Sequence, residues 1–165
     1  MPKVSIITPI YGVEKYIERC ARSLFEQTLE DIEYVFVNDC TPDCSMAVLE
    51  SVINKYPNRK SSVRILTHTV NQGLPAARKT GFDTALGDFI IFCDSDDWME
   101  QEMIATLYNT AIQSSADMVV CGYNEATETE KKPIHIRTDG TDIFRDIIAD
   151  RIQGYTWNKM VRRMV

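Results

Sequence analysis

Four consecutive polar residues carry the strongest chemical signal in this sequence: Asp94-Ser95-Asp96-Asp97, directly after the apolar run 89–93. On an extended backbone, residues two apart point the same way, so Asp94 and Asp96 are expected to aim their carboxylates together. Two like charges held close repel each other unless a cation lies between them. Carboxylate oxygens suit Mg²⁺ or Mn²⁺, which keep positions open for water and phosphate oxygens. Asp94 and Asp96 therefore predict a metal site that would neutralise a bound phosphate.

Asp97 completes this run and has a second interpretation. An aspartate before a helix commonly caps it, and Asp97 precedes Trp98-Met99-Glu100, so we interpret it as a cap rather than a ligand. Asp94 directly follows an apolar strand, where a solvated charge is unusual, and this favours the ligand interpretation for Asp94 and Asp96. The D-x-D pattern alone is common, so its position at a strand end carries the argument.

Composition and charge limit the classes of function. The 165 residues suffice for one domain with its own core. The formal charge of −6 argues against sequence-independent binding to nucleic acid, which needs clustered Lys and Arg. The five cysteines are an odd number without C-x-x-C spacing, so we expect no zinc site and a reduced, cytoplasmic setting.

The two ends of the sequence give weaker signals. The first residues lack the apolar run and cleavage site of a signal peptide, and no segment is long enough to cross a bilayer. We interpret the basic pair Arg162-Arg163 as a solvated end, with a contact to a membrane surface or an acceptor as the alternative. Trp157, Met160 and Val161 would need a surface to cover, so we expect the chain to be a truncated piece of a longer one.

Short apolar runs alternate with helical periodicities along the chain. The runs predict strands over 4–8, 32–37, 63–67, 89–93 and 118–121. The periodicities predict helices over 13–27, 49–56, 74–85, 103–111 and 143–152. This alternation predicts an α/β fold, with a mostly parallel sheet covered by helices on both faces.

In such sheets, ligands bind outside the carboxyl ends of the strands. The loops expected there contain Pro9-Ile10-Tyr11-Gly12, Asn38-Asp39 and the acidic run, so the polar chemistry gathers where the fold would place a ligand. After Tyr123 the character changes, because 124–132 is polar without a hydrophobic period. We interpret that stretch as a loop or flap.

The motifs together resemble those of family 2 glycosyltransferases. The resemblance is carried in order by the segments 4–11, Val37-Asn38-Asp39, Asn71-Gln72-Gly73 with Ala76-Ala77-Arg78, and 87–92 with the acidic run. It covers roughly residues 3 to 123, and Trp157-Asn158-Lys159-Met160 is similar to a W-x-K stretch of bacterial members. The resemblance implies the GT-A fold, a Rossmann-like, mostly parallel sheet with helices on both faces. It implies one domain over 1–165, with a nucleotide-sugar-binding half at 1–123 and a partial acceptor-side segment at 124–165.

The same resemblance implies roles on the nucleotide side. Pro9 and Tyr11 would form the wall around the base, and Asp39 would accept a hydrogen bond from a base N–H. Arg78 would face the diphosphate or the base. The alternatives are a turn-forming role for Asp39 and an exposed helical position for Arg78. Gly12 stands where the family usually has Asn.

On the phosphate side, the resemblance implies that Asp94 contacts the ribose or the metal and that Ser95 binds the nucleotide. Asp96 would hold the Mg²⁺ or Mn²⁺ ion that bridges the phosphates. Asn38 replaces the first Asp of a frequent pair, and Lys79 replaces an Asn that commonly follows the arginine. Neither departure touches the metal pair.

The implied activity is metal-assisted transfer, with inversion, from a nucleotide-diphosphate sugar to a glycan or lipid-linked acceptor. A UDP-sugar is the expected donor, and the inner face of the cell membrane is the implied place of action. The catalytic base is not identified: Asp139, Asp142 and Asp146 precede the W-x-K stretch, and we expect the base beyond Val165. The alternative is therefore a module that binds a nucleotide sugar without transferring it.

Other nucleotide-binding classes lack their motifs in this sequence. A dinucleotide-binding dehydrogenase needs G-x-G-x-x-G after the first strand, and a P-loop enzyme needs G-K-[ST]. Neither pattern is present. An aspartyl phosphatase usually carries D-x-D after the first strand, whereas here it follows the fourth expected strand.

Overall fold

A computed structural model gives the fold for residues 1–127, 130–136, 143–148 and 154–163. Its main sheet has six strands in the order β3-β2-β1-β4-β8-β5. The strands are β1 (Val4–Ile10), β2 (Ile32–Asn38), β3 (Val63–Thr67), β4 (Phe89–Phe92), β5 (Met118–Val120) and β8 (Lys159–Arg162). β1 pairs in parallel with β2 and β4, and β2 pairs in parallel with β3. This confirms the α/β fold with a mostly parallel sheet.

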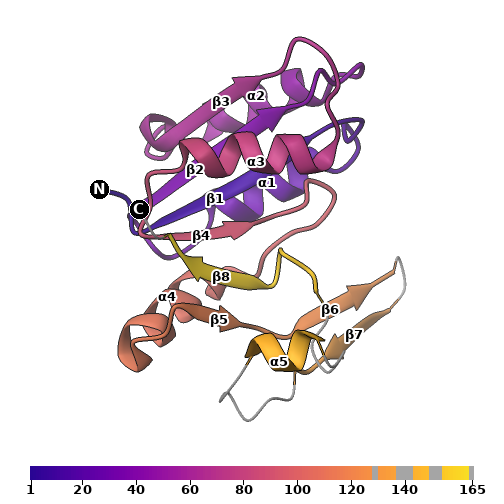
Figure 1. Ribbon diagram of the computed structural model, residues 1–165. Coiled ribbons are helices and arrows are strands. Elements are labelled where there is room, and N and C mark those ends of the chain that lie inside the picture. Colours follow the sequence, from indigo (N-terminus) through magenta and orange to yellow (C-terminus); the bar gives the residue numbers. More distant parts are fainter. Residues whose placement is uncertain (128–129, 137–142, 149–153, 164–165) are drawn as a thin grey trace.

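Helices cover both faces of this sheet (Figure 1). The helices are α1 (Ile17–Phe25), α2 (Ser45–Lys55), α3 (Leu74–Thr84), α4 (Met103–Ser114) and the short α5 (Ile143–Ile148). α1 and α2 lie on one face, and α3 lies on the other. Among the described residues, no helix is long and apolar enough to cross a membrane.

The alternation of side chains along the strands explains this division. Ile6 and Phe36 belong to the larger buried cluster, which also contains residues of α1, α2 and α4. Ile7 and Val37 point to the other face, where they pack with Ala77 of α3. Successive strand residues face opposite ways, and both faces are covered, so these strands read as continuous apolar runs.

The segment after Tyr123 corrects the expected loop over 124–132. β6 (Tyr123–Ala126) and β7 (Lys131–Ile134) form an antiparallel hairpin, in which Tyr123 pairs with Ile134. Most of its side chains are exposed, so neither strand needs the apolar pattern from which a strand is predicted. The expected helix over 143–152 is described as α5, and 149–152 lie outside the described residues.

The basic pair near the C-terminus is also corrected, because it is not a solvated end. β8 is inserted between β4 and β5 and runs antiparallel to both. Arg162 Nε lies 2.8 Å from Asp117 Oδ1, and its guanidinium lies over the Phe89 ring. Arg163 Nε donates to the Gly87 carbonyl at 2.8 Å. Met160 in β8 is fully buried. The sheet itself therefore provides the apolar surface that Met160 was expected to need.

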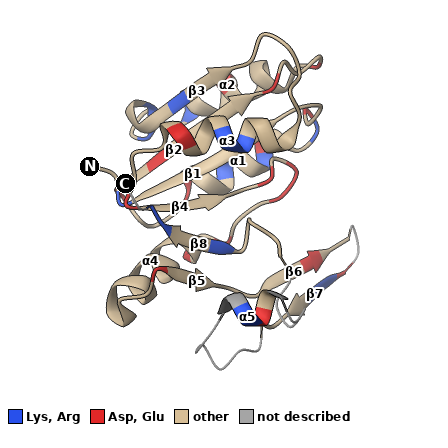
Figure 2. Cartoon of the chain, in the orientation of Figure 1, with Lys and Arg blue, Asp and Glu red and all other residues tan. Residues whose placement is uncertain are grey.

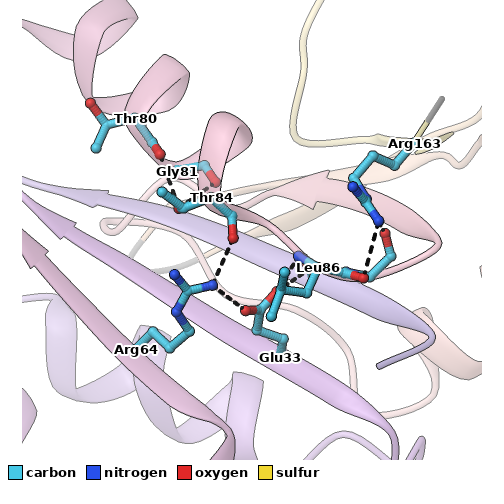
Figure 3. Close-up of polar contacts among 9 residues, drawn as sticks. Glu33, Arg64, Thr80, Gly81, Thr84, Leu86 and Arg163 are labelled. Atoms are coloured by element: carbon cyan, nitrogen blue, oxygen red, sulfur yellow. Dashed lines mark hydrogen bonds and ion pairs between the residues drawn. The ribbon is translucent and has the colours of Figure 1, made fainter. Parts of the chain in front are cut away.

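A polar network fastens the amino-terminal end of the sheet (Figure 3). Glu33 of β2 is buried and accepts hydrogen bonds from Ser5 Oγ (2.5 Å), the Leu86 amide (2.8 Å) and Arg64 (2.7 Å). Arg64 also donates to the Thr84 carbonyl, so it connects β3 to the end of α3. Burial alone would raise the pKa of the Glu33 carboxyl, but these hydrogen bonds and the Arg64 charge hold it below its usual value.

Replacement of this carboxylate should destabilise the fold. In Glu33→Gln an amide N–H₂, which cannot accept a hydrogen bond, replaces one carboxylate oxygen that accepts hydrogen bonds in the wild type. We therefore expect the free energy of unfolding to fall by about 1–3 kcal/mol. Urea unfolding at pH 7 measures it. Glu50→Gln, at an exposed position of α2, is the matched control and should change stability by less than about 0.5 kcal/mol.

The loss of stability in Glu33→Gln should depend on pH. The folded pKa of Glu33 is depressed, so its stabilisation is present above the unfolded pKa and is lost as pH falls through the folded pKa. The stability gap between wild type and Glu33→Gln should therefore narrow in acid, below about pH 4.5. A gap that stays constant there would contradict this assignment.

Candidate functional site

The loops at the carboxyl ends of β1, β2 and β4 lie together at one edge of the sheet. The register pairs Ile10 with Asn38, and Ile7 with Phe92, so the three strands end close to one level. The amide of Asp39 donates to the Ile10 carbonyl at 3.0 Å, and that of Cys93 donates to the Ile7 carbonyl at 2.9 Å. The expected gathering of the polar loops is therefore present.

The loop before α1 is held by the loop before α2. The Gly12 amide donates to Thr41 Oγ1 at 2.8 Å, and the Glu14 amide donates to Asp43 Oδ2 at 2.9 Å. In return, the Cys44 amide donates to Glu14 Oε2 at 2.9 Å. Neither helix has a side-chain hydrogen bond from its own N-cap residue, so side chains of the two loops satisfy nearby amides instead.

Asp43 is the main fastener of this pair of loops. Its carboxylate accepts hydrogen bonds from the Ser45 hydroxyl (2.6 Å), the Thr41 hydroxyl (2.7 Å), and the amides of Glu14 and Ser45. Partial burial would raise the pKa of Asp43, but these donors lower it strongly. Pro9 is buried at the end of β1, whereas Tyr11 beyond it is 51% exposed on this fixed loop.

Asp39 is almost fully buried and is held by three donors. Oδ1 accepts from His68 Nδ1 at 2.7 Å and from the Gln72 amide at 2.9 Å, and Oδ2 accepts from the Gly73 amide at 2.8 Å. Burial would raise the pKa of Asp39, but these hydrogen bonds lower it. A carboxylate offers about four acceptor positions, so there is room for one further donor. Whether a base N–H is that donor stays a prediction.

Two residues here differ from what the sequence indicated. The turn before Thr41 is made by Asn38, whose Oδ1 accepts from the Thr41 amide at 2.9 Å, so the turn-forming alternative belongs to Asn38 rather than Asp39. Sequence reasoning missed His68, which connects Asp39 to Thr80 of α3 through Nε2 at 2.9 Å. Its position just after β3, at the same sheet edge, is the signal that could have found it.

The acidic loop after β4 meets a basic group of α3 (Figure 2). Arg78 and Asp94 form an ion pair of 2.6 Å, with both side chains about three-quarters buried. Within the described part of the chain, Arg78 Nε is buried without a hydrogen-bond partner. Arg78 is therefore not the exposed helical arginine of the alternative interpretation. Its guanidinium faces the acidic loop and has hydrogen-bonding capacity left.

Asp96 and Asp97 are the exposed members of this loop, while Ser95 between Asp94 and Asp96 is buried. Arg19 donates to the Asp96 carbonyl at 3.1 Å and stacks on the Trp98 ring at 3.8 Å, which holds the loop from the α1 side.

The expected capping role of Asp97 is wrong. The next helix, α4, begins only at Met103, and its N-cap residue is Glu102. Asp97 is only partly screened from solvent, and this desolvation first, and then the charges of Asp96 and Asp94, raise the pKa of its carboxyl. The loop therefore concentrates negative charge instead of starting a helix.

The carboxylates of the acidic loop are the candidate ligands for a divalent metal ion. Among the described residues no group of three or more His, Cys, Asp or Glu side chains could form a complete protein cage. Asp94 is paired with Arg78, and Asp96 has no ion pair in the described part of the chain. Mg²⁺ commonly binds through one or two carboxylates together with substrate phosphates. These residues fit an ion of that kind, which a bound diphosphate would help to hold.

The structure describes one of the three residues considered for the catalytic base. Asp139 and Asp142 lie outside the described residues. Asp146 lies in α5 and is buried. We assign no catalytic base within the described part of the chain.

Comparisons with known proteins agree with this architecture. The model of the family described as Glycosyl transferase family 2 matches residues 5–161. An uncharacterized glycosyltransferase of Bacillus subtilis, EpsJ, is 36% identical over 99% of this chain and 48% of its own length. The chain thus spans about half the length of the curated relatives that it matches.

Solved structures with the GT-A fold superpose on this chain. S. aureus TarS 1–349 in complex with UDP has a TM-score of 0.79 at 24% identity, covering 97% of this chain and 46% of TarS. The mannosyltransferase PcManGT of Pyrobaculum calidifontis, in complex with GDP-Man and Mn²⁺, has a TM-score of 0.66 at 21% identity. The match covers 74% of this chain and 36% of PcManGT. At these identities the likeness establishes the GT-A fold.

Removing the negative charge of the buried Asp39 should destabilise the fold. In Asp39→Asn an amide N–H₂ must face the His68 or backbone donors, so we expect the free energy of unfolding to fall by about 1–3 kcal/mol. Urea unfolding at pH 7 measures the change. Asp88→Asn is the matched control on an exposed aspartate. Equal stability of the two variants would contradict the fastening role of Asp39.

Proposed function

The chain belongs to glycosyl transferase family 2, and we propose that it binds a nucleotide-diphosphate sugar at the carboxyl edge of its sheet. The observation that carries this proposal is the Arg78–Asp94 pair beside the exposed Asp96. A cationic group and a carboxylate-rich loop meet where three strand-end loops converge. A diphosphate bridged to a divalent ion has both signs of charge and suits this arrangement.

On the nucleotide side, Tyr11 and Pro9 would form the wall around the base. The exposed ring of Tyr11 can stack on a base, and the loop that carries it is held by Thr41 and Asp43. The remaining acceptor position of Asp39 would receive a base N–H. Because three donors already fix that carboxylate, its direction is set before a nucleotide binds.

On the phosphate side, Asp94 and Asp96 would hold Mg²⁺ or Mn²⁺, with Ser95 between them as a further nucleotide contact. The ion would supply positive charge against the charge that develops on the diphosphate leaving group. Arg78 can offer N–H donors to the same phosphates while it stays paired with Asp94. A UDP-sugar is the proposed donor. TarS structures with UDP and with UDP-GlcNAc support this choice, whereas the GDP-Man complex of PcManGT makes GDP the nucleotide to compare.

The proposed reaction is transfer of the sugar to a glycan or lipid-linked acceptor with inversion at the anomeric centre. Residues 1–123 would form the donor-binding half, and 124–165 would form part of the acceptor side. The odd number of cysteines supports a cytoplasmic place of action, at the inner face of the membrane if the acceptor is lipid-linked.

Donor binding is tested by thermal melting with UDP and with GDP, each with and without Mn²⁺. A ligand that binds only the folded state, at a free concentration about 100 times its Kd, stabilises that state by about 2.7 kcal/mol. We therefore expect the melting temperature to rise by several degrees. The rise should require Mn²⁺, should be larger for UDP than for GDP, and should disappear in Asp96→Ala.

Asp83→Ala is the matched control, because Asp83 is an exposed aspartate on α3 whose ion pair with Lys79 is local. It should keep the full nucleotide response. If no nucleotide shifts the melting of wild type in the presence of Mn²⁺, the proposed donor site is wrong.

A module that binds a nucleotide sugar without transferring it is the second candidate, because we assign no base among the described residues. UDP-sugar hydrolysis by the same sample separates the two. Nucleotide binding together with release of free sugar supports an enzyme, and binding without release supports the module.

A further inference from the structure

A cavity lies between the acidic loop and the β6–β7 hairpin. Its volume is about 400 Å³, within the range of roughly 300–1,000 Å³ typical of small-ligand pockets. Its wall combines the acidic loop, the start of the β6–β7 hairpin and the segment before β8. Figure 1 shows the hairpin and this segment side by side beyond β5.

Aromatic rings dominate one wall of this cavity. Tyr155 and Trp157 are stacked, with ring centroids 5.1 Å apart and planes 15° apart. Tyr123 meets both rings edge-on, at 6.0 Å and 4.9 Å. Tyr155 remains 45% exposed, so the stack is not sealed in a core. Trp98 of the acidic loop lines the same cavity.

This aromatic wall is held rigidly by polar contacts behind it. Asn158 Nδ2 donates to the Cys121 carbonyl at 3.2 Å, and the Cys121 amide donates to the Asn158 carbonyl at 3.1 Å. Lys159 Nζ donates to the Tyr155 carbonyl at 2.5 Å. The W-x-K stretch therefore fixes the rings against the end of β5. A platform fixed in advance loses little freedom when a ligand binds.

The rest of the lining mixes apolar side chains, such as Met99 and Met103, with polar and acidic ones. Asp97, Glu100 and Asn124 contribute carboxylate and amide groups, and Lys131 of the hairpin pairs with Glu100 at 2.5 Å. The Lys131–Glu100 pair joins the hairpin to the acidic loop at the rim. Such a pocket offers a flat apolar surface next to several hydrogen-bond acceptors.

We propose that this cavity is a subsite for a sugar ring of the acceptor, stacked on the Tyr155–Trp157 wall. A pyranose ring has C–H faces that pack on aromatic rings and a rim of hydroxyls that donate to carboxylates and amides. A phosphate or nucleotide is disfavoured, because Asp97 and Glu100 would repel it.

The acceptor is the source of this ring because of the position of Asp97. Asp97 follows the proposed metal ligand Asp96 directly and lines the cavity, so a ring bound there lies beside the donor phosphates without displacing them. This assignment rests on the proposed function. It deepens that function, because it requires the acceptor to present a sugar ring rather than a linear alditol or a lipid chain.

Tryptophan fluorescence tests the proposal directly, because the chain has two tryptophans and both line the cavity. The probes are the methyl glycosides of glucose, galactose and N-acetylglucosamine, with ribitol as the linear control. At least one glycoside should change the emission with a saturable curve, and ribitol should not. Tyr155→Ala keeps both tryptophans and should lower the affinity for that glycoside about tenfold. Tyr155→Phe keeps the ring and should retain binding.

The matched control on the nucleotide side is Tyr11→Ala. This variant should keep the fluorescence response to the glycoside and should have a lower affinity for UDP. Tyr155→Ala should keep the melting shift with UDP and Mn²⁺, which also shows that it folds. A wild type that is stabilised by UDP but gives no saturable glycoside response, or responds equally to ribitol, overturns the subsite and leaves the proposed function intact.

The source of the ring is tested with the donor present. Glycoside binding should persist in saturating UDP-N-acetylglucosamine with Mn²⁺. Competition by this donor but not by UDP would mean that the cavity holds the donor sugar, which overturns the acceptor assignment. A glycoside response without any UDP response would refute the proposed donor site, and with it the assignment of the ring to an acceptor.

Discussion

The central strand β1 is the constraint on which the rest of the structure depends. All seven of its residues are buried, and it is hydrogen-bonded to β2 on one edge and to β4 on the other. A one-residue slip of either neighbour would turn that neighbour's core side chains to the opposite face. The register is therefore fixed, and the loops that follow β1, β2 and β4 must leave the sheet at nearly the same level. Only then do Tyr11, Asp39 and Asp94 share one edge.

Three buried or partly buried carboxylates hold the loops at the two ends of this sheet in place. Glu33 fastens the amino-terminal end of the sheet, while Asp39 and Asp43 fasten the carboxyl end. Each accepts hydrogen bonds from backbone amides as well as from side chains, and this offsets the cost of taking a carboxylate out of water. Because the donors come from segments distant in sequence, each carboxylate connects loops that the strands only bring near each other. The loops before α1 and α2 become one unit in this way, and Asp39 joins the approach to α3 to that unit.

The sequence predicted the features that depend on local pattern. Apolar runs located β1 to β5, and periodicity located α1 to α4, because one face or both faces of each element had to be buried. Features that depend on distant partners were not predicted. β8 belongs between β4 and β5, but nothing local to Lys159–Arg162 indicates this, and the local sequence favours a solvated Arg162. The hairpin β6–β7 was missed because its exposed side chains carry no apolar alternation. The residues after Asp97 predict a helix that it would cap, but that helix begins only at Met103.

The same distinction applies to the candidate site and explains which residues sequence reasoning could find. The D-x-D run was visible because its neighbours on the chain make its charge unusual, whereas the role of His68 depends on Asp39 and Thr80, far away in sequence. The aromatic wall beside Asp97 is of this second kind, since Tyr123 comes from β6, and Tyr155 and Trp157 from the approach to β8. The acidic loop therefore has two neighbours of different character, the Arg78 guanidinium and the aromatic wall. In the proposed function Arg78 would attract the anionic diphosphate, and the uncharged rings of Tyr155 and Trp157 would favour a neutral sugar ring. The negative charge of the loop would keep the two proposed ligands apart, because a phosphate group on the aromatic side would face Asp97 and Glu100, and Lys131 there is already paired with Glu100.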